Sequence, residues 1–206
     1  MPPGQIPIDK EDLERGPVTV PGGTGVKLNL GSYTVQFHHG WTNVDIADLS
    51  DWSRAHGYRF VRHDLLKPLW LDSGVADAIV SSHTLEHFPY EQGAALLREC
   101  HRVLRPGGTC RIIVPDAELL TSEAILGTLD RFDEVSPTAA ARSTQMGKLW
   151  ELLMGGGHQA LYDAPTLTAA MEAAGFRDVE VCRPFRSRSQ AIQRETWDMF
   201  PDLSVI

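Results

Sequence analysis

Residues 75–114, VADAIVSSHTLEHFPYEQGAALLRECHRVLRPGGTCRIIV, contain a complete strand–helix–strand pattern. Val75–Val80 and Thr109–Val114 are short apolar runs typical of buried strands. Between them, apolar residues recur at helical spacing over Glu91–Leu104, and Pro106-Gly107-Gly108 ends that helix. The stretch therefore predicts a βαβ unit and, with it, a parallel sheet.

The same alternation continues on both sides of this unit. Upstream we expect strands at Val26–Leu30, Thr42–Ile46 and Tyr58–Val61, with a helix over Ser50–His56. Downstream we expect helices over Glu118–Leu129, Ala139–Met154 and Thr166–Ala174, a strand at Val179–Cys182, and the start of an antiparallel edge strand at Leu203–Ile206. The pattern predicts an α/β protein with a doubly wound, mostly parallel sheet and helices on both faces. Residues 1–25, rich in Pro and Gly, are expected to form an N-terminal arm, and residues 26–206 a single domain.

Composition limits the classes of function. The 206 residues carry 19 Lys and Arg against 27 Asp and Glu, a formal net charge of −8. This acidic balance disfavours a nucleic-acid substrate and suits a cationic ligand. The three cysteines lack metal-ligand spacing, and no apolar run reaches the length of a membrane span. A cytoplasmic protein with no membrane or nucleic-acid partner is therefore expected.

Polar residues follow four of the predicted strands. They are Gly31, Asp45, Asp64 and the segment Ser81–His87. In open parallel sheets, ligands bind beyond the carboxyl ends of the strands, where the strand order reverses. These residues are the first candidates for a binding site.

In order and spacing, several segments resemble class I S-adenosylmethionine-dependent methyltransferases, of the methyltransferase type 11-like group found in bacterial polysaccharide and natural-product pathways. The segments are Leu28–Gly31, Gly40–Ile46, Asp64-Leu65, Ser82–His87, His101–Gly108 and Val114–Asp116. The resemblance runs from about Lys27 to Phe185 and implies a Rossmann-like fold with S-adenosylmethionine as cofactor.

The resemblance also implies roles for single residues. Asp45 would accept hydrogen bonds from the ribose hydroxyls, and Asp64 one from the adenine amino group. Both carboxylates have an alternative role as helix or turn caps. Gly31 would let the backbone approach the cofactor closely. The remaining candidate cofactor contacts are Ser32, Ile46, Leu65, Ser82 and His83.

Three residues are candidates for catalysis. His87 is the expected general base, because an imidazole titrates near neutrality, and its alternative role is to brace the turn after the fourth strand. His158 and Tyr162 follow the Gly155–Gly157 hinge and would bind or deprotonate the acceptor, or lie in a solvated loop. The variable region at about residues 117–165 is expected to form the acceptor pocket. With one Glu-His pair and no third ligand at telling spacing, we expect no metal.

The first loop departs from the family pattern. The family usually has Gly-x-Gly there, whereas this chain has Gly31-Ser32-Tyr33, followed by the bulky Phe37, His38 and His39. We expect an enzyme that methylates a small molecule, at a hydroxyl of a sugar or secondary metabolite, with a nitrogen as the alternative acceptor atom. A non-catalytic binding or scaffold protein is the alternative. The phosphate cradle Gly-x-Gly-x-x-Gly of nicotinamide-dependent oxidoreductases is absent. A short final strand leaves open its completion by another subunit of a homo-oligomer.

Overall fold

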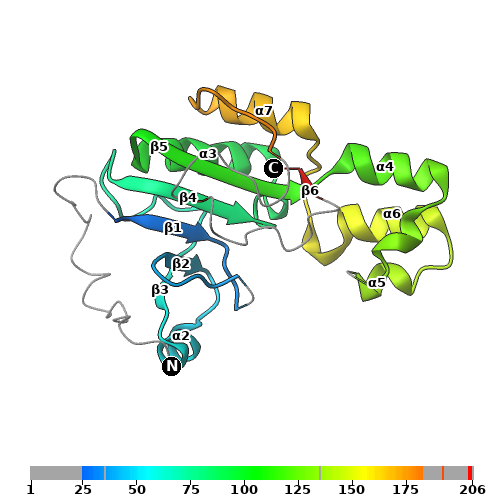
Figure 1. Cartoon of the computed structure of the whole chain (residues 1–206), viewed down its shortest axis with the longest axis horizontal. Helices are drawn as coiled ribbons and strands as arrows, with labels where there is room; N and C mark the ends of the chain where they lie inside the picture. Colours follow the sequence, from blue (N-terminus) through cyan, green and yellow to red (C-terminus); the bar gives the residue numbers. More distant parts are fainter. Residues whose placement is uncertain (1–24, 35, 135, 183–191, 193–203, 206) are drawn as a thin grey trace.

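The structure is a computed structural model that describes residues 25–34, 36–134, 136–182, 192, 204 and 205 of the chain. The predicted N-terminal arm, residues 1–25, lies outside this part except for Gly25, as does most of the sequence after Cys182. Figure 1 shows the sheet beside a group of short helices at one end.

The sheet has six strands in the order β3-β2-β1-β4-β5-β6. The strands are β1 (Lys27–Leu30), β2 (Thr42–Asp45), β3 (Arg59–Arg62), β4 (Ala76–Ser82), β5 (Leu104–Pro115) and β6 (Ser204–Val205). The first five pair in parallel, and β6 pairs antiparallel with the end of β5. This order confirms the doubly wound, Rossmann-like sheet, and the strand order reverses between β1 and β4.

One helix lies between β2 and β3 and one between β4 and β5, and the other described helices follow β5. The helices are α2 (Ser50–His56), α3 (Tyr90–Val103), α4 (Ala117–Leu126), α5 (Pro137–Ala140), α6 (Gln145–Met154) and α7 (Ala164–Ala173). Short 3-10 turns follow β4 at η1 (Leu85–His87), α4 at η2 (Leu129–Phe132) and α6 at η3 (Gly155–Gly157). None of the helices in the described ranges is long and apolar enough to cross a lipid bilayer.

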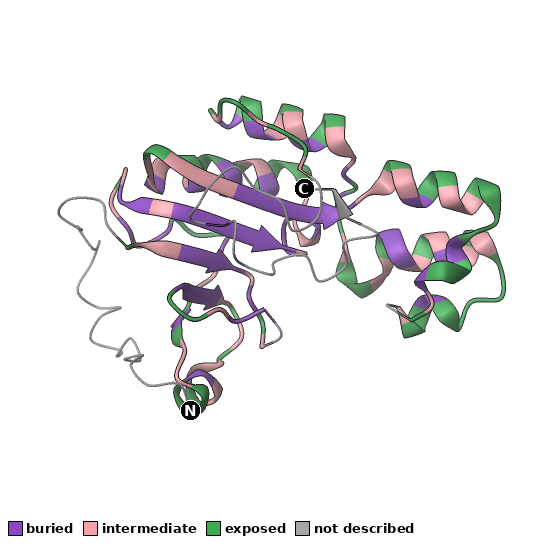
Figure 2. Ribbon diagram, in the orientation of Figure 1, coloured by how far each residue is buried: buried purple, intermediate pink, exposed green. Residues whose placement is uncertain are grey.

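Strand residues alternate between two packed faces, as Figure 2 shows by the buried colour of the central strands. On one face, Ile79 of β4 belongs to the large cluster that includes Leu97 of α3 and Met171 of α7. On the other face, Val80 of β4 packs in a smaller cluster around Trp41. Helices also lie on this second face. Phe37 stacks on Phe60 of β3 and meets Trp52 of α2 edge to face, with ring centroids 5.7 and 5.0 Å apart.

Two predicted helices on either side of β5 differ from those observed. The single helix expected over Ala139–Met154 is two helices, because Ser136 and Thr144 each cap a new helix by accepting from the backbone N–H of Ala139 and Gly147. The helix before β5 also ends at Val103, since Leu104 already has extended backbone angles and begins the strand.

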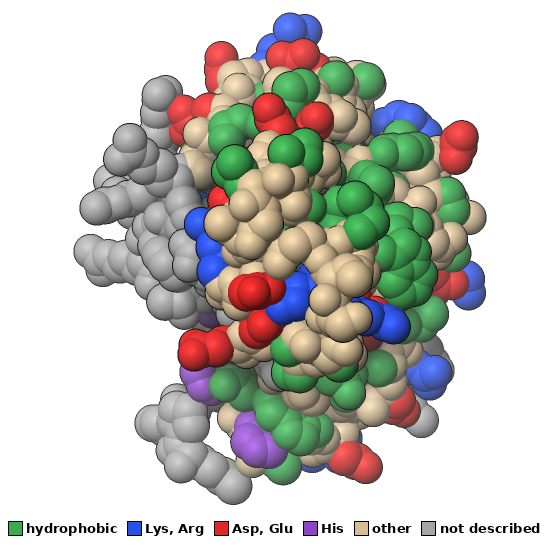
Figure 3. Space-filling view, turned by 90° about the vertical axis from the view of Figure 1, so that its right-hand side faces the viewer, with side chains coloured by type: hydrophobic (Ala, Val, Ile, Leu, Met, Phe, Trp, Pro, Cys, Tyr) green, Lys and Arg blue, Asp and Glu red, His purple; other side chains and the backbone are tan. Residues whose placement is uncertain are grey.

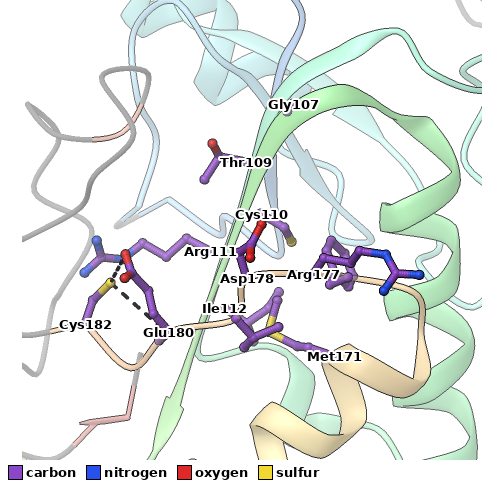
Figure 4. A pocket seen from close by; sticks show the side chains of 13 residues that line it. Gly107, Thr109, Cys110, Arg111, Ile112, Met171, Arg177, Asp178, Glu180 and Cys182 are labelled. Atoms are coloured by element: carbon purple, nitrogen blue, oxygen red, sulfur yellow. Dashed lines mark hydrogen bonds between the residues drawn. The ribbon is translucent and has the colours of Figure 1, made fainter.

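The strand expected at Val179–Cys182 does not form. A cavity of about 460 Å³ separates this segment from β5, with Thr109, Arg111 and Glu180 among its lining residues. Figure 4 shows the segment crossing in front of β5 rather than lying alongside it. Asp178 has a positive φ of 57°, which is not a strand conformation, so the chain turns directly before the predicted strand.

The helices α4, α5 and α6 form a three-helix extension with its own core. That core contains Leu120, Leu129, Phe132, Ala139, Leu152 and Leu153. Figure 3, which faces this end of the molecule, shows hydrophobic side chains at the surface among charged ones. Trp150 of α6 is 56% exposed and Leu126 of α4 is 72% exposed. The extension corresponds to the region in which the acceptor pocket is expected.

Candidate active site

A cavity of about 380 Å³ opens at the carboxyl ends of β1, β2, β3 and β4. It is lined by Gly31, Tyr33, Asp45, Ile46, Asp64, Leu65, Leu66, His83, Thr84, His87 and Phe88. Its volume lies in the range of about 300–1,000 Å³ that small-molecule sites occupy. The sheet therefore brings together six predicted cofactor contacts (Gly31, Asp45, Ile46, Asp64, Leu65, His83) and the predicted base His87 at its switch point.

Gly31 allows the chain after β1 to pass directly against the segment after β4. Its φ of +71° is one that residues with a Cβ rarely adopt. A Cβ at this position would stand 2.1 Å from Thr84 Oγ1, which is far inside van der Waals contact. Thr84 Oγ1 is in turn 3.3 Å from the carbonyl oxygen of Leu30, so the two strand ends are bonded together. Gly31 is thus required by close approach, on the rim of the cavity.

Asp45 is held by the backbone at the end of β2. Its Oδ2 accepts the backbone N–H of Tyr33 at 2.8 Å, and its Oδ1 accepts that of Ala47 at 2.9 Å. Each carboxylate oxygen has a second lone pair, so the carboxylate can still accept bonds from a ligand. Both alternatives raised from the sequence are compatible here, because Asp45 caps the turn and lines the cavity.

Asp64 follows β3 and has a similar local role. Its Oδ1 accepts the backbone N–H of Leu66 at 3.0 Å, which is the turn-capping alternative. The same residue lines the cavity together with Leu65, whose side chain is buried in the main core. Ile46, in contrast, is 62% exposed, so its apolar side chain is available at the cavity mouth.

Two predicted contacts lie away from the cavity surface. Ser32 and Ser82 are both fully buried and neither is among the lining residues. Ser32 donates its backbone N–H to Val44 O at 3.1 Å, so it is part of the packing behind the cavity. Tyr33, Leu66, Thr84 and Phe88 line the cavity and were not predicted to bind cofactor. Thr84 and Phe88 flank residues that were predicted, so sequence position alone was a usable signal for them.

The bulky first loop does not wall the cavity. Phe37 is buried against Trp52, Tyr58 and Phe60 on the far face of the sheet. The loop is held there by buried amides: Asn29 donates to Gln36 O at 2.5 Å, and Asn43 to His38 O at 3.1 Å. Only Tyr33 of the atypical loop residues reaches the cavity, and its side chain is 57% exposed.

Beside the cavity lies a cluster of Glu86, His87 and His158. One ligand atom of each lies within 4.8 Å of the others, and the rings of His87 and His158 meet edge to face. Glu86 is 1% exposed, yet neither of its carboxylate oxygens accepts a hydrogen bond from the described residues. Its nearest basic group is Nδ1 of His83, 3.3 Å from Oε1. Glu86 was not predicted as a site residue, because its burial is not visible in the sequence.

Backbone bonds join the two distant segments that form this cluster. The carbonyl of Glu86 accepts the N–H groups of Gln159 and Ala160 at 2.7 and 3.1 Å. The side chain of Gln159 donates to His87 O at 2.7 Å. These bonds fix residue 158 next to residue 87, although 71 positions separate them. The structure thus brings together the predicted catalytic residues His87 and His158.

His158 is half-buried and has a defined orientation. Its Nδ1 lies 3.0 Å from Leu153 O, which can only accept, so Nδ1 carries the proton. Burial lowers the pKa of His158 below its ordinary value, and the Glu86 carboxylate opposes this shift. Nε2 then points its lone pair toward Glu86, 4.0 Å from Oε1.

Tyr162 is not placed as a base. Its side chain is 2% exposed and belongs to the main core. Burial, reinforced by Tyr90 and Glu86, raises the pKa of Tyr162 to about 12. A phenol with that pKa is already protonated at neutral pH, so it cannot take up a proton from the methyl acceptor. Its backbone instead joins the sheet, since Tyr162 O accepts the N–H of Ala117 at 2.8 Å.

The chain is similar to known methyltransferases. A methyltransferase domain family model matches residues 22–181. A search of curated proteins found no match. The chain resembles an S-adenosylmethionine-dependent methyltransferase from Thermotoga maritima, described as a possible histamine N-methyltransferase, with 18% identity and a TM-score of 0.53. The match covers 75% of this chain and 65% of that one.

Two further solved structures share the fold. A methyltransferase from Mesorhizobium loti, dependent on S-adenosylmethionine, has 18% identity and a TM-score of 0.50, with 82% of each chain covered. The S-adenosylmethionine-dependent methyltransferase SibL has 17% identity and a TM-score of 0.52, with 85% of this chain and 48% of that chain covered. The chain thus spans less than two thirds of the T. maritima and SibL structures.

Proposed function

Because the chain belongs to the methyltransferase domain family, we propose that it transfers a methyl group from S-adenosylmethionine to a hydroxyl group of a small molecule. The observation that carries this proposal is one cavity lined by Asp45, Asp64 and His87 together. The first two are acceptors suited to bind the cofactor, and the third is a base suited to activate an acceptor.

The residues around the cavity fit the cofactor. Asp45 would accept bonds from the ribose hydroxyls, Asp64 one from the adenine amino group, and Leu65 and Ile46 would pack on the adenine ring. Gly31 leaves the space that a Cβ would fill beside Thr84. When bound, the sulfonium cofactor supplies the electrophilic methyl group.

The protein then has two tasks at the acceptor. It must hold the acceptor oxygen in line with the methyl group, and it must take up the hydroxyl proton. We assign proton uptake to His87, which lines the cavity. His158 lies beside it, and the two imidazole rings meet edge to face. A sugar or secondary metabolite is the substrate class that we propose.

The competing candidate is a non-catalytic member of the family, favoured by Tyr33 in place of the second glycine. Against it stands the position of the Tyr33 side chain, which is more than half exposed and leaves the cavity open beside it. Calorimetric titration with S-adenosylmethionine and S-adenosylhomocysteine, followed by transfer of a labelled methyl group to a panel of hydroxylated acceptors, tests the proposal. A folded protein that binds neither compound would overturn it in favour of a scaffold.

A further inference from the structure

The cluster of Glu86, His87 and His158 contains two hydrogen-bond acceptors that should repel each other. Glu86 is fully buried, and neither carboxylate oxygen accepts a hydrogen bond from the described residues. The Nε2 lone pair of His158 faces it from 4.0 Å, because Nδ1 has already donated to Leu153 O. Two acceptors that face each other in a buried place need a proton or a cation between them.

The third member of the cluster completes a set of metal ligands. His87 contributes an imidazole nitrogen, so two histidines and one glutamate lie with their ligand atoms within 4.8 Å of one another. Two histidines and one carboxylate are the protein ligands of many catalytic zinc sites, which keep a fourth position open. We propose that Glu86, His87 and His158 bind one first-row divalent transition-metal ion, with Zn²⁺ as the best fit to these ligands.

The surroundings support this site beyond the three ligands. The bond from His158 Nδ1 to a backbone carbonyl is the usual way in which a metal-binding histidine is oriented. His83 Nδ1 lies 3.3 Å from Glu86 Oε1, so a further imidazole flanks the carboxylate without a hydrogen bond to it. Mg²⁺ and Ca²⁺ prefer oxygen ligands and are not expected here.

The glycine turn before His158 passes close to both histidines. A Cβ at Gly156 would stand 3.8 Å from His158 Nε2, and one at Gly157 would stand 3.9 Å from His87 Nδ1. Both glycines have positive φ, of 67° and 89°. The turn therefore packs its backbone against the two imidazoles. Zinc ligands in a tetrahedral site lie about 3.4 Å apart, so binding requires ligand atoms that lie within 4.8 Å to approach by up to about 1.4 Å.

The position of the site gives the ion a role, and this step rests on the function proposed above. His87 lines the cofactor cavity, so an ion bound to it would reach an acceptor oxygen through its open coordination position. With the ion bound, His87 would act as its ligand and not as the base, and the ion would activate the acceptor, because a bound divalent ion lowers the pKa of a coordinated hydroxyl and fixes its direction. The ion would thus favour an acceptor whose hydroxyl oxygen can occupy that position.

The test measures metal binding without the cofactor. Chelator-treated full-length protein is titrated with ZnCl₂ by calorimetry, and with CoCl₂ while the visible spectrum is recorded. We expect one ion per chain, and at least about tenfold weaker binding in each of His158→Ala, His87→Ala and Glu86→Gln. His56→Ala, at the exposed end of α2, is the matched control and should bind as the wild type does. MgCl₂ should not compete.

Other outcomes are decisive as well. No uptake of Zn²⁺ or Co²⁺ by the folded wild type overturns the site. Unchanged affinity in His158→Ala also overturns it, because the ion would then bind at other histidines. If Glu86→Gln does not fold, the two histidine variants still decide. Binding of S-adenosylhomocysteine, measured with chelator present, separates failure of this site from failure of the proposed function.

Discussion

The backbone N–H of Tyr33 is hydrogen-bonded to Oδ2 of Asp45 at 2.8 Å. The residue that departs from the Gly-x-Gly pattern is therefore tied to the carboxylate that is expected to bind the ribose. This position requires a φ of +35° at Tyr33, which a glycine would adopt without strain. Because the bond uses the main chain and the ring is mostly exposed, the identity of the side chain matters less than the path of the loop.

This relationship predicts opposite results for two substitutions. Asp45→Ala removes the ribose acceptor and the anchor of the loop, so we expect about 10- to 100-fold weaker binding of S-adenosylhomocysteine, as for loss of charged hydrogen bonds. Tyr33→Ala keeps the main-chain bond and should change the affinity by less than about threefold. Calorimetry measures both. Asp51→Ala, at a carboxylate on α2 that is 99% exposed, is the control. Wild-type affinity in Asp45→Ala would show that the cofactor binds elsewhere.

A second prediction concerns close approach at Gly31. Gly31→Ala places a Cβ 2.1 Å from Thr84 Oγ1, whereas Gly74→Ala, at nearly the same φ of +75°, meets no atom within 4 Å. Both variants carry backbone strain, so their difference isolates the clash. We expect Gly31→Ala to be less stable than Gly74→Ala by about 1–3 kcal/mol, the usual cost of overpacking. Urea denaturation of the two variants measures this, and equal losses would refute the steric argument.

The sheet was predictable because local patterns determine it. The apolar runs in β4 and β5 are buried strands, and burial on both faces favours uninterrupted runs such as Ala78–Val80. The polar residues at the strand ends were then placed at one edge by the parallel topology alone. That is why Asp45, Asp64 and His87 were found.

What the sequence did not reveal depends on contacts between distant segments. The burial of Glu86 follows from the return of residues 158–160 against its carbonyl, which no local pattern shows. The same holds for His158, whose partner Leu153 is set by the glycine turn. The sequence does not predict the break between α5 and α6, because apolar residues recur at helical spacing across both helices. Ser136 and Thr144 act as caps only where the helix axis changes, and that change is not visible in the sequence.

The third prediction concerns the assigned base. His87→Ala should lower kcat for methyl transfer by about 10²- to 10⁴-fold, the range for loss of a general base. Its effect on the binding of S-adenosylhomocysteine should be much smaller, because Asp45 and Asp64 remain. Transfer of labelled methyl groups gives kcat, and calorimetry gives the affinity. His56→Ala should match the wild type in both. An equal loss in kcat and in cofactor affinity would instead assign His87 to cofactor binding.

The fourth prediction is a pH dependence of stability outside the site. Glu99 of α3 accepts the backbone N–H of Leu69 at 2.7 Å and the Nε of Arg102 at 2.8 Å, and Arg102 also donates to Leu71 O at 2.9 Å. The hydrogen bond from Arg102 is the first cause that lowers the pKa of Glu99 below its ordinary value of 4.5. The ionised carboxylate thus ties the loop after β3 to α3.

The sign of the effect follows from this lowered pKa. A carboxylate with a lower pKa in the folded state contributes its full stability above the unfolded value of 4.5, and loses it as the pH falls through the folded value. Glu99→Gln should therefore cost about 1–3 kcal/mol at neutral pH, as for breaking a partly buried charged hydrogen bond. The difference in the free energy of unfolding between wild type and variant should disappear in acid. Urea denaturation at a series of pH values measures it, with the exposed Glu172→Gln on α7 as control. A gap that stays constant down to the acid transition would show that shape, and not charge, is what Glu99 contributes.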